Sequence, residues 1–555
     1  MTKQNSQVQR GAAPRRRLRL DGWTVGALII ALVVLGPILS VVWIALHPSE
    51  NIWPHLMASV LPRYLGNTLI LMIGVAALTA LFGVVCAWLV TMYRFPGRRW
   101  LSYALLFPLA IPAYVGAYAL VDFLDYAGPL QSAMRGMFGW QDTRDYWFPE
   151  VRSHGPAIIV LASALYPYVY LLARAAFREQ SGSAFEVARS LGAGHWALFW
   201  RLGLPLVRPA VAAGLALVLM ETVADYGTVL HFGVQTLTTG VFSTWLSGNN
   251  AGGAAQIAVV ILTLILLLVT LERYGRRKAR FHAVNRALRP IAPVVLHGVR
   301  GWAATGFCLL PFAMGFVLPV TVMSGHAIRR PEVWTAPGLL PAFGNTVFVA
   351  GIAGILTVLA ATYLVYGTRL MGRTVARIAL PLTTLGYAAP GAVLALGLLI
   401  PLAALDHGIA DGVVWLTGRD PGLTLTGTSA AIILAYFVRF FGVAEGALDA
   451  AFGRISPNLP MAARSLGRGA GGTLRDVYLP LMKGSVATAL LVVFVDCVKE
   501  LPATLLLRPF NFNTLSTRTF ELASLERLGE AAPAALLVML VGLAAVAILA
   551  HTNRE

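Results

Sequence analysis

Long, continuous runs of apolar residues alternate along the chain with short polar segments, and this pattern predicts helices that cross a membrane. A bilayer core about 30 Å thick requires roughly 20 apolar residues per helix. The runs lack the strict apolar and polar alternation that is typical of the strands of a membrane barrel. We therefore expect an all-α, polytopic membrane protein with about twelve transmembrane helices, near residues 22–47, 65–92, 101–124, 156–173, 206–232, 254–272, 301–324, 344–366, 378–404, 429–446, 484–507 and 530–550.

The composition agrees with this reading. Hydrophobic residues make up 57% of the 555 residues, charged residues only 12%, and the mean hydropathy is +0.71, which leaves too little polar surface to cover a soluble globule. Lysine and arginine are retained on the cytoplasmic side of a membrane. With the N-terminus inside, 30 of the 43 Lys and Arg lie in cytoplasmic segments, 10 in external segments and three within spans. We therefore expect both termini in the cytoplasm, and a net charge of +18 that reflects membrane sorting and anionic lipid rather than nucleic acid.

The chain reads as two copies of one unit. The sequence "LGNTL" at 65–69 recurs as "FGNTV" at 343–347, and "QTLTTGVF" at 235–242 recurs as "NTLSTRTF" at 513–520, both displaced by 278 positions. Each copy contains six expected spans, an even number, so matching segments lie on the same side of the membrane. We predict a basic cytoplasmic N-terminus over 1–21, a first domain over 22–290 and a second domain over 291–555. The three cysteines, which fall inside spans, are expected to pack as small apolar residues.

A second repeated pattern lies in the cytoplasmic loop between the fourth and fifth spans of each half. It reads "EVARSLGAGHWALFWRLGLP" over 186–205 and "MAARSLGRGAGGTLRDVYLP" over 461–480, with the same gap of 13 from glycine to proline. The glycine permits the turn that ends a helix, and the proline starts the next helix. Between them we expect an exposed apolar face, formed by His195, Trp196, Phe199 and Trp200. One such loop alone could be an ordinary connector between two helices. Two loops with the same internal spacing indicate a protruding segment that binds in a groove of another protein.

This pattern resembles the "EAA" loop of the membrane subunits of bacterial ABC importers, which contains a coupling helix that inserts into a separate ATPase subunit. The chain itself has no G-x-x-x-x-G-K-[ST] motif to hold ATP phosphates. The resemblance implies that two copies of an ATPase bind below the membrane, that ATP and Mg²⁺ bind there, and that this chain is a transport subunit without enzyme activity or cofactor. Val187 stands in the middle of the first triplet, and the second copy has methionine in place of the expected glutamate. The matching residues are Glu186, Ala188, Gly192, Leu204, Pro205, Met461, Ala462, Ala463, Gly467, Leu479 and Pro480.

The fifth span of each half carries two carboxylates spaced i, i+4, which places both on one helix face. Ionisable groups at membrane depth are costly unless they are paired or line a wet path. Oxygen ligands suit a hard cation, and Tyr226 could add a phenolic oxygen. We expect a translocation path in which the carboxylates contact a metal ion only transiently, because strong binding would trap it. Alternatively, Lys499 and Arg439 neutralise the carboxylates as structural ion pairs. The carboxylates are Glu221, Asp225, Asp496 and Glu500, and the two pairs are 275 positions apart.

Two stretches of the sequence indicate which kind of ABC importer the chain resembles. "ADYGTVLHFGVQTLTTGVFSTW" (224–245) and "KELPATLLLRPFNFNTLSTRTFELAS" (499–524) resemble the fused, twelve-helix permeases of ferric-iron ABC importers. The resemblance implies two tandem six-helix type I ABC importer transmembrane domains in a bacterial inner membrane, and a periplasmic binding protein that delivers Fe(III). Related fused permeases handle thiamine or phosphonates, and these cargoes stay open alternatives.

Two further questions stay open at this point. The longest external segment, 128–155, is expected either to form a docking face for the binding protein or, through Trp140, Trp147 and Phe148, to lie at the lipid headgroups. A secondary transporter driven by an ion gradient would also fit twelve helices in two parallel halves. A membrane enzyme finds no support, because the chain shows neither a zinc-spacing cluster nor a nucleophile motif in a suitable context.

Overall fold

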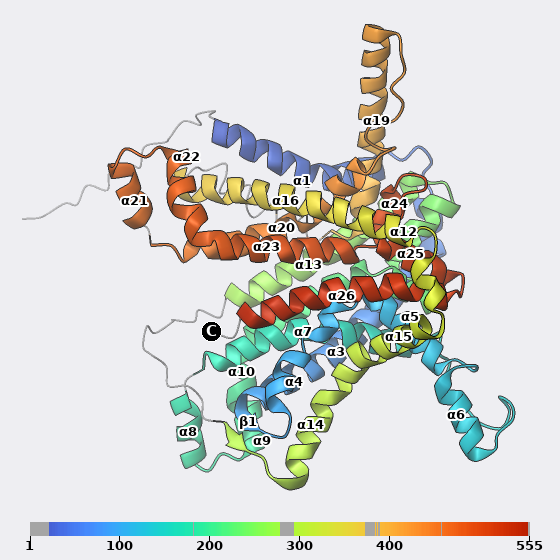
Figure 1. The fold of residues 1–555 in the computed structure, drawn as a ribbon, viewed down its shortest axis with the longest axis vertical. Coiled ribbons are helices and arrows are strands. Elements are labelled where there is room, and N and C mark those ends of the chain that lie inside the picture. Colours follow the sequence, from blue (N-terminus) through green and yellow to red (C-terminus); the bar gives the residue numbers. More distant parts are fainter. Residues whose placement is uncertain are drawn as a thin grey trace, which may run out of the picture.

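The computed structural model describes residues 22–180, 182–277, 293–371, 383, 386, 389–456 and 458–552. The expected N-terminal segment 1–21 and the domain boundary at 290/291 lie outside these residues. Within the described ranges the protein is helical, apart from one parallel pair of two-residue strands (Figure 1).

The elements of the first half are α1 (Gly22–Leu46), α2 (Trp53–Ala58), α3 (Leu61–Met92), β1 (Tyr93–Arg94), α4 (Arg98–Ala104), η1 (Phe107–Ala110), α5 (Ala113–Leu124), α6 (Pro129–Phe138), α7 (His154–Arg178), α8 (Gly182–Ser190), α9 (His195–Ala197), η2 (Leu198–Gly203), α10 (Leu204–Ala224), α11 (Gly227–His231), α12 (Leu237–Phe242), η3 (Ser243–Ser247) and α13 (Ala251–Arg277). The elements that follow are β2 (Val294–Val295), α14 (Gly298–Phe312), η4 (Ala313–Val317), α15 (Leu318–Arg329), η5 (Pro331–Thr335), α16 (Leu339–Met371), α19 (Gly391–Thr417), α20 (Ala430–Gly453), α21 (Asn458–Ser465), α22 (Ala470–Thr473), η6 (Leu474–Tyr478), α23 (Leu479–Lys499), α24 (Pro502–Leu507), α25 (Leu515–Ser524) and α26 (Leu528–Thr552).

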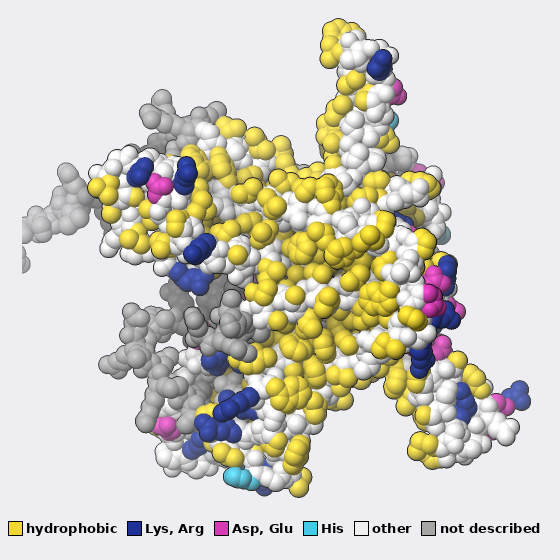
Figure 2. All heavy atoms as spheres, in the orientation of Figure 1, with side chains coloured by type: hydrophobic (Ala, Val, Ile, Leu, Met, Phe, Trp, Pro, Cys, Tyr) yellow, Lys and Arg dark blue, Asp and Glu magenta, His cyan; other side chains and the backbone are white. Residues whose placement is uncertain are grey.

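The expected number of spans is confirmed. Among the described residues, 11 helices are long and apolar enough to cross a membrane, and a bent pair raises the number to 12. Apolar side chains cover the middle of the bundle, and charged side chains gather at its two ends (Figure 2). This distribution is typical of a protein that spans a bilayer.

Several expected spans are interrupted. The span at 101–124 bends by 96° between Ala110 and Ala113, where Pro112 precedes the first residue of α5. The spans at 206–232 and 484–507 each break into two helices, α10 with α11 and α23 with α24. The span expected at 378–404 continues past its predicted end as α19, which begins at Gly391 and runs through Pro401 to Thr417, and Gly418, whose φ is 69°, ends the helix.

The first helix of each half packs on the other half. In α1, Ala27 and Val34 are buried in the core that α16, α20 and α23 form. In α14, Ala304 and Cys308 are buried in the core of α3 and α7. Figure 1 shows the same exchange, with α1 beside α16 and α14 beside α4. All three cysteines are buried and free.

The two short sequence repeats bind each other within each half. The Thr68 Oγ1 accepts a hydrogen bond of 3.1 Å from the Leu237 N–H, and the Thr346 Oγ1 accepts one of 2.8 Å from the Leu515 N–H. The asparagine next to each threonine donates to a carbonyl two residues before that leucine, at 2.8 and 3.0 Å. Buried N–H groups require hydrogen-bond partners, and here the threonine of each "GNT" motif is the partner of the leucine N–H of the "TL" motif in the same half. The two motifs therefore recur together.

Candidate functional site

The repeated loops between the fourth and fifth expected spans of each half form two matching segments, which we name the first coupling segment (186–205) and the second coupling segment (461–480). In both, the glycine ends a short helix in the left-handed conformation, with φ of 83° at Gly192 and 82° at Gly467. The Gly192 N–H donates to the Arg189 carbonyl at 2.9 Å, and the next N–H, of Ala193, donates to the Ala188 carbonyl at 3.0 Å. The second segment repeats both bonds. This is the hydrogen-bond pattern in which glycine closes a helix.

The chain after the glycine differs from the expectation that proline starts a new helix. A helix begins at His195 in the first segment and passes through a wide π turn into α10. The second segment does the same from Ala470 through η6 into α23. Pro205 and Pro480 lie just past the wide turns. Proline has no N–H to donate, and a wider turn before it accommodates the missing hydrogen bond.

Most residues of the coupling segments face outward, with one correction. Phe199, expected on the exposed face, is only 9% exposed, because it packs with Trp88 at a ring distance of 5.3 Å. Trp196 is 74% exposed, and Met461 of the second segment is 62% exposed. Glu186, Ala462 and Gly467 are exposed, Ala188, Leu204 and Pro205 are half-buried, Ala463 is buried, and Gly192, Leu479 and Pro480 are exposed.

The first coupling segment is tied to the body of the protein through an aromatic cluster. Phe185 of α8 is buried and packs with Trp88 of α3 at 6.0 Å. The Tyr93 hydroxyl of β1 and Nδ1 of His195 share a hydrogen bond of 3.2 Å. Burial raises the pKa of Tyr93, so the phenol stays neutral at physiological pH. In Figure 1, α8 and α21 lie at the same end of the bundle. Packed rings therefore connect α8 to α3.

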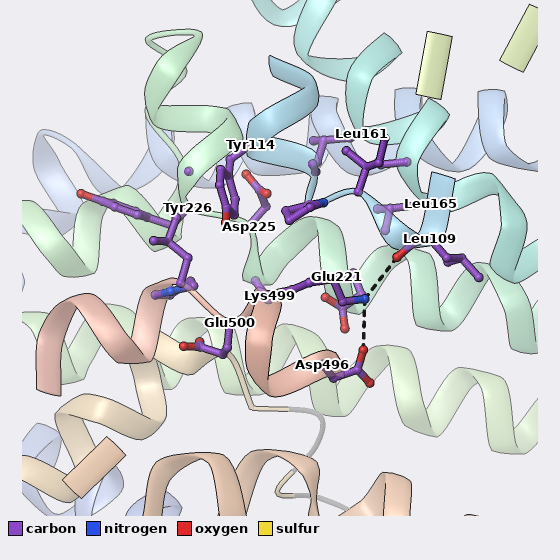
Figure 3. A pocket seen from close by; sticks show the side chains of 18 of the residues that line it. Leu109, Tyr114, Leu161, Leu165, Glu221, Asp225, Tyr226, Asp496, Lys499 and Glu500 are labelled. Atoms are coloured by element: carbon purple, nitrogen blue, oxygen red, sulfur yellow. Dashed lines mark hydrogen bonds and ion pairs between the residues drawn. The ribbon is translucent and has the colours of Figure 1, made fainter. Parts of the chain in front are cut away.

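The four intramembrane carboxylates line one pocket between the halves, with a cavity volume of about 150 Å³ (Figure 3). The last turns of α10 and α23, together with the breaks that follow them, supply five of its six charged groups, and η1, α5, α7 and α20 complete the wall. Gly227 is required at the contact between the two breaks, since a Cβ there would lie 2.9 Å from Leu501 Cδ2 and 2.8 Å from Tyr114 Cβ. The carboxylates that the sequence places on two separate helices thus meet across the interface of the halves.

Two of the carboxylates cap the helices that follow the breaks. Asp225 Oδ1 accepts from the Val229 N–H at 3.1 Å, and Oδ2 accepts from the Thr228 hydroxyl at 2.9 Å. Glu500 Oε1 accepts from the Ala503 N–H at 2.9 Å, and Oε2 accepts from the Thr504 N–H at 3.0 Å. Side-chain acceptors at this position satisfy the free N–H groups of a helix start.

Arg439 and Lys499 pair with carboxylates of the second half. Arg439 Nη1 lies 3.4 Å from Glu500 Oε1, with side chains 12% and 1% exposed. Lys499 Nζ lies 3.2 Å from Asp496 Oδ1 and donates to the Leu109 carbonyl of the first half at 3.2 Å. The ion pairs that the sequence allowed as an alternative are therefore present in the second half. Glu221 points into the same pocket (Figure 3).

Tyr226 does not supply the expected phenolic oxygen. Its ring stacks on Phe242 at 3.7 Å, and its hydroxyl points away from the carboxylates (Figure 3). Sequence reasoning also missed Tyr114, Tyr168 and the Leu109 carbonyl, which line the pocket. The proline-rich sequence "FPLAIPAY" (107–114) holds a signal for an exposed carbonyl, because prolines interrupt helical hydrogen bonding there. Within the part of the chain that the structure describes, no three His, Cys, Asp or Glu side chains come close enough to hold a metal ion.

Comparison with known proteins identifies the family. The family model for the binding-protein-dependent transport system inner membrane component matches residues 79–281. An Fe(3+)-transport system permease protein of Haemophilus influenzae is 27% identical over 481 residues, which cover 86% of this chain and 87% of that protein. A ferric transport system permease protein of Actinobacillus pleuropneumoniae is 22% identical over 528 residues, 89% of this chain and 73% of that protein.

A shorter relative has a higher sequence identity over a smaller part of the chain. A protein described as a 2-aminoethylphosphonate transport system permease of Salmonella paratyphi A is 32% identical over 237 residues, which cover 42% of this chain and 78% of that protein. Two matching halves, a pair of matching loop segments and a shared internal pocket agree with these likenesses. The chain belongs to the family of binding-protein-dependent transport system inner membrane components, and it is a non-catalytic, multi-pass inner membrane permease of an ABC importer.

Proposed function

We propose that this permease translocates Fe(III) that a periplasmic binding protein delivers. The observation that carries the proposal is the charge of the central pocket, where four carboxylates face one arginine and one lysine. The excess of carboxylate favours a hard cation over an oxyanion, because hard cations prefer oxygen ligands. The positions equivalent to Lys499 and Arg439 in the first half hold Ala224 and Ala164. The first half therefore contributes the excess negative charge, through Glu221 and Asp225.

The size of the pocket supports an ion over the organic alternatives. Its cavity volume of about 150 Å³ is small beside the roughly 300 to 1,000 Å³ that is usual for small-molecule sites. Thiamine, with its two linked rings, would require a larger space in this conformation. The relatives named for ferric iron match most of the chain, whereas the phosphonate relative matches less than half of it.

The coupling segments are proposed to face the cytoplasm and to bind two copies of an ATPase, which supply ATP and Mg²⁺. The bias of lysine and arginine supports this orientation and places both termini inside. Val187 and Leu191 in the first segment, and Met461 and Leu466 in the second, offer exposed apolar side chains to the ATPase. Closure of the two ATPases would move both segments and open the pocket to the other side of the membrane.

Iron uptake by cells tests the cargo. We expect cells that carry the permease together with its ATPase and its binding protein to accumulate radioactive Fe(III) that the binding protein delivers. Glu221→Gln should reduce this uptake at least roughly tenfold, since a contact with a charged group contributes about 1.5 to 3 kcal/mol. Co-purification of the ATPase with the variant should be unchanged. Glu50→Gln, at an exposed position outside the pocket, is the matched control.

Other results would contradict the proposal. Accumulation of thiamine or 2-aminoethylphosphonate in place of iron would overturn the assigned cargo. Uptake that continues with an inactive ATPase, but stops when the proton gradient is dissipated, would instead support the secondary transporter.

A further inference from the structure

A second charged cavity lies apart from the central pocket, at the end of the bundle where the coupling segments lie. We name it the arginine cavity. It has a volume of about 470 Å³, and its lining includes Arg98, Arg99, Arg174 and Arg178. The arginines come from α4 and from the last turn of α7, and Pro293, just before β2, closes one side. Figure 2 shows Lys and Arg side chains gathered over β1 and α4.

Two of the four guanidinium groups are held in place by the protein. Arg174 Nη1 donates to the Ser102 carbonyl at 2.9 Å, and the group lies over the Tyr103 and Tyr170 rings at 5.9 and 5.8 Å. Arg98 Nε donates to the Val90 carbonyl at 2.7 Å. A guanidinium carries five N–H donors, so each of these contacts uses only part of the available donors.

The cluster has no acidic partner among the residues that the structure describes. No carboxylate lines the arginine cavity, and none forms an ion pair with any of its four arginines. Like charges held close together destabilise the fold. A bound anion would remove that repulsion, and the planar fork of arginine matches the oxygens of a phosphate group.

The position of the cavity indicates that the phosphate group belongs to a membrane lipid. Val90 and Thr91 end the membrane helix α3, and Arg174 and Arg178 end the membrane helix α7. Trp100, 48% exposed on α4, is of the kind that lies at lipid headgroups. In the orientation proposed above, the cavity opens at the inner leaflet, where basic pockets between membrane helices bind anionic phospholipids.

The second half lacks the counterparts of two of these four arginines. In the alignment of "ARAAFRE" (173–179) with "LDAAFGR" (448–454), Arg174 corresponds to Asp449 and Arg178 to Gly453. We infer that the arginine cavity binds the phosphate group of one anionic phospholipid of the inner leaflet, on the first half only. This site is separate from the translocation path and does not depend on which cargo the permease carries.

Native mass spectrometry of the purified full chain tests the inference, with tetraoleoyl cardiolipin as the probe. We expect one tightly bound cardiolipin on the wild type. Arg98→Gln with Arg174→Gln should weaken its binding roughly 25-fold, since each basic residue near a membrane surface contributes roughly a fivefold factor. The control is Arg208→Gln with Arg454→Gln, which removes the same charge from exposed positions outside the cavity and should leave binding unchanged.

A third variant separates binding from folding. Arg178→Gln changes an exposed side chain and should weaken cardiolipin binding roughly fivefold even if the double variant fails to fold. Equal cardiolipin binding by the wild type and Arg178→Gln would overturn the inference. So would displacement of cardiolipin by millimolar inorganic phosphate, which would identify a site for a soluble anion, or equally tight binding of dioleoyl phosphatidylcholine, which would exclude recognition of negative charge.

Discussion

Asp225 and Glu500 occupy equivalent positions in the two halves, and each caps the helix that follows a break in a membrane span. The capping carboxylates explain how two spans can be interrupted at membrane depth without leaving free N–H groups, which are costly in a bilayer. They also place two negative charges at the contact between the halves. The same side chains thus shape the pocket and set its charge.

Removing the charge of Asp225 and removing that of Glu500 should have unequal effects on stability, because Glu500 forms an ion pair with Arg439. Glu500→Gln should destabilise the protein by about 3 to 5 kcal/mol, because it leaves the buried Arg439 without its partner. Asp225→Asn weakens a cap whose donors are the Val229 N–H and the Thr228 hydroxyl, and should cost only about 1 kcal/mol. Thermal unfolding in detergent, followed by intrinsic fluorescence, measures both. If the Arg439→Gln and Glu500→Gln double variant is no more stable than Glu500→Gln, the pair is not the cause.

Gly391 lies against the same ion pair and allows a second test. A Cβ at this position would lie 2.4 Å from Glu500 Oε1 and 2.5 Å from Arg439 Nη1. Gly391→Ala should therefore separate the pair and destabilise the protein by about 1 to 3 kcal/mol. Gly412→Ala is the matched control on the same helix, because no atom lies within 4 Å of its added Cβ. Equal unfolding temperatures for the two variants would show that the contact is relaxed at no cost.

The left-handed glycines of the coupling segments predict a loss of ATPase binding without a loss of insertion. Gly192→Val and Gly467→Val force a β-branched residue into a conformation that costs L-residues roughly 1 to 2 kcal/mol, and should end α8 or α21 wrongly. We expect each variant to insert in the membrane and to co-purify with less ATPase. Gly484→Val, at an exposed helical position with open space around it, is the control. Normal co-purification by both coupling variants would refute the proposed role.

The hydrogen bonds between the repeated motifs predict matched losses of stability in both halves. Thr68→Val and Thr346→Val keep the side-chain shape but leave the N–H of Leu237 or Leu515 without its acceptor, at a cost of about 1 to 3 kcal/mol. Thr263→Val, whose exposed hydroxyl bonds only to its own helix, should cost less than 0.5 kcal/mol or so. Chemical unfolding of the three variants compares them, and a loss confined to one half would argue against the equivalence of the repeats.

The sequence determined the number of spans, the twofold repeat and the matching turns at Gly192 and Gly467. These features follow from local pattern. An apolar run of about 20 residues has few alternatives to a membrane helix, and glycine at a helix end fixes a turn through its own φ. The i, i+4 spacing of the carboxylates predicted one helix face for each pair, but this is wrong for the second member, because Asp225 and Glu500 lie one residue past the ends of α10 and α23.

Only the tertiary structure decided which elements meet. The exchange of α1 and α14 between the halves, the burial of Phe199 against Trp88 and the turn of Tyr226 towards Phe242 depend on residues far apart in the chain. The ion pairs of Arg439 and Lys499 depend on packing in the same way. In a membrane protein an apolar helix is similar on all its faces. Its sequence therefore sets its length and its depth in the membrane. Its neighbours are selected by close packing against helices that are distant in the chain.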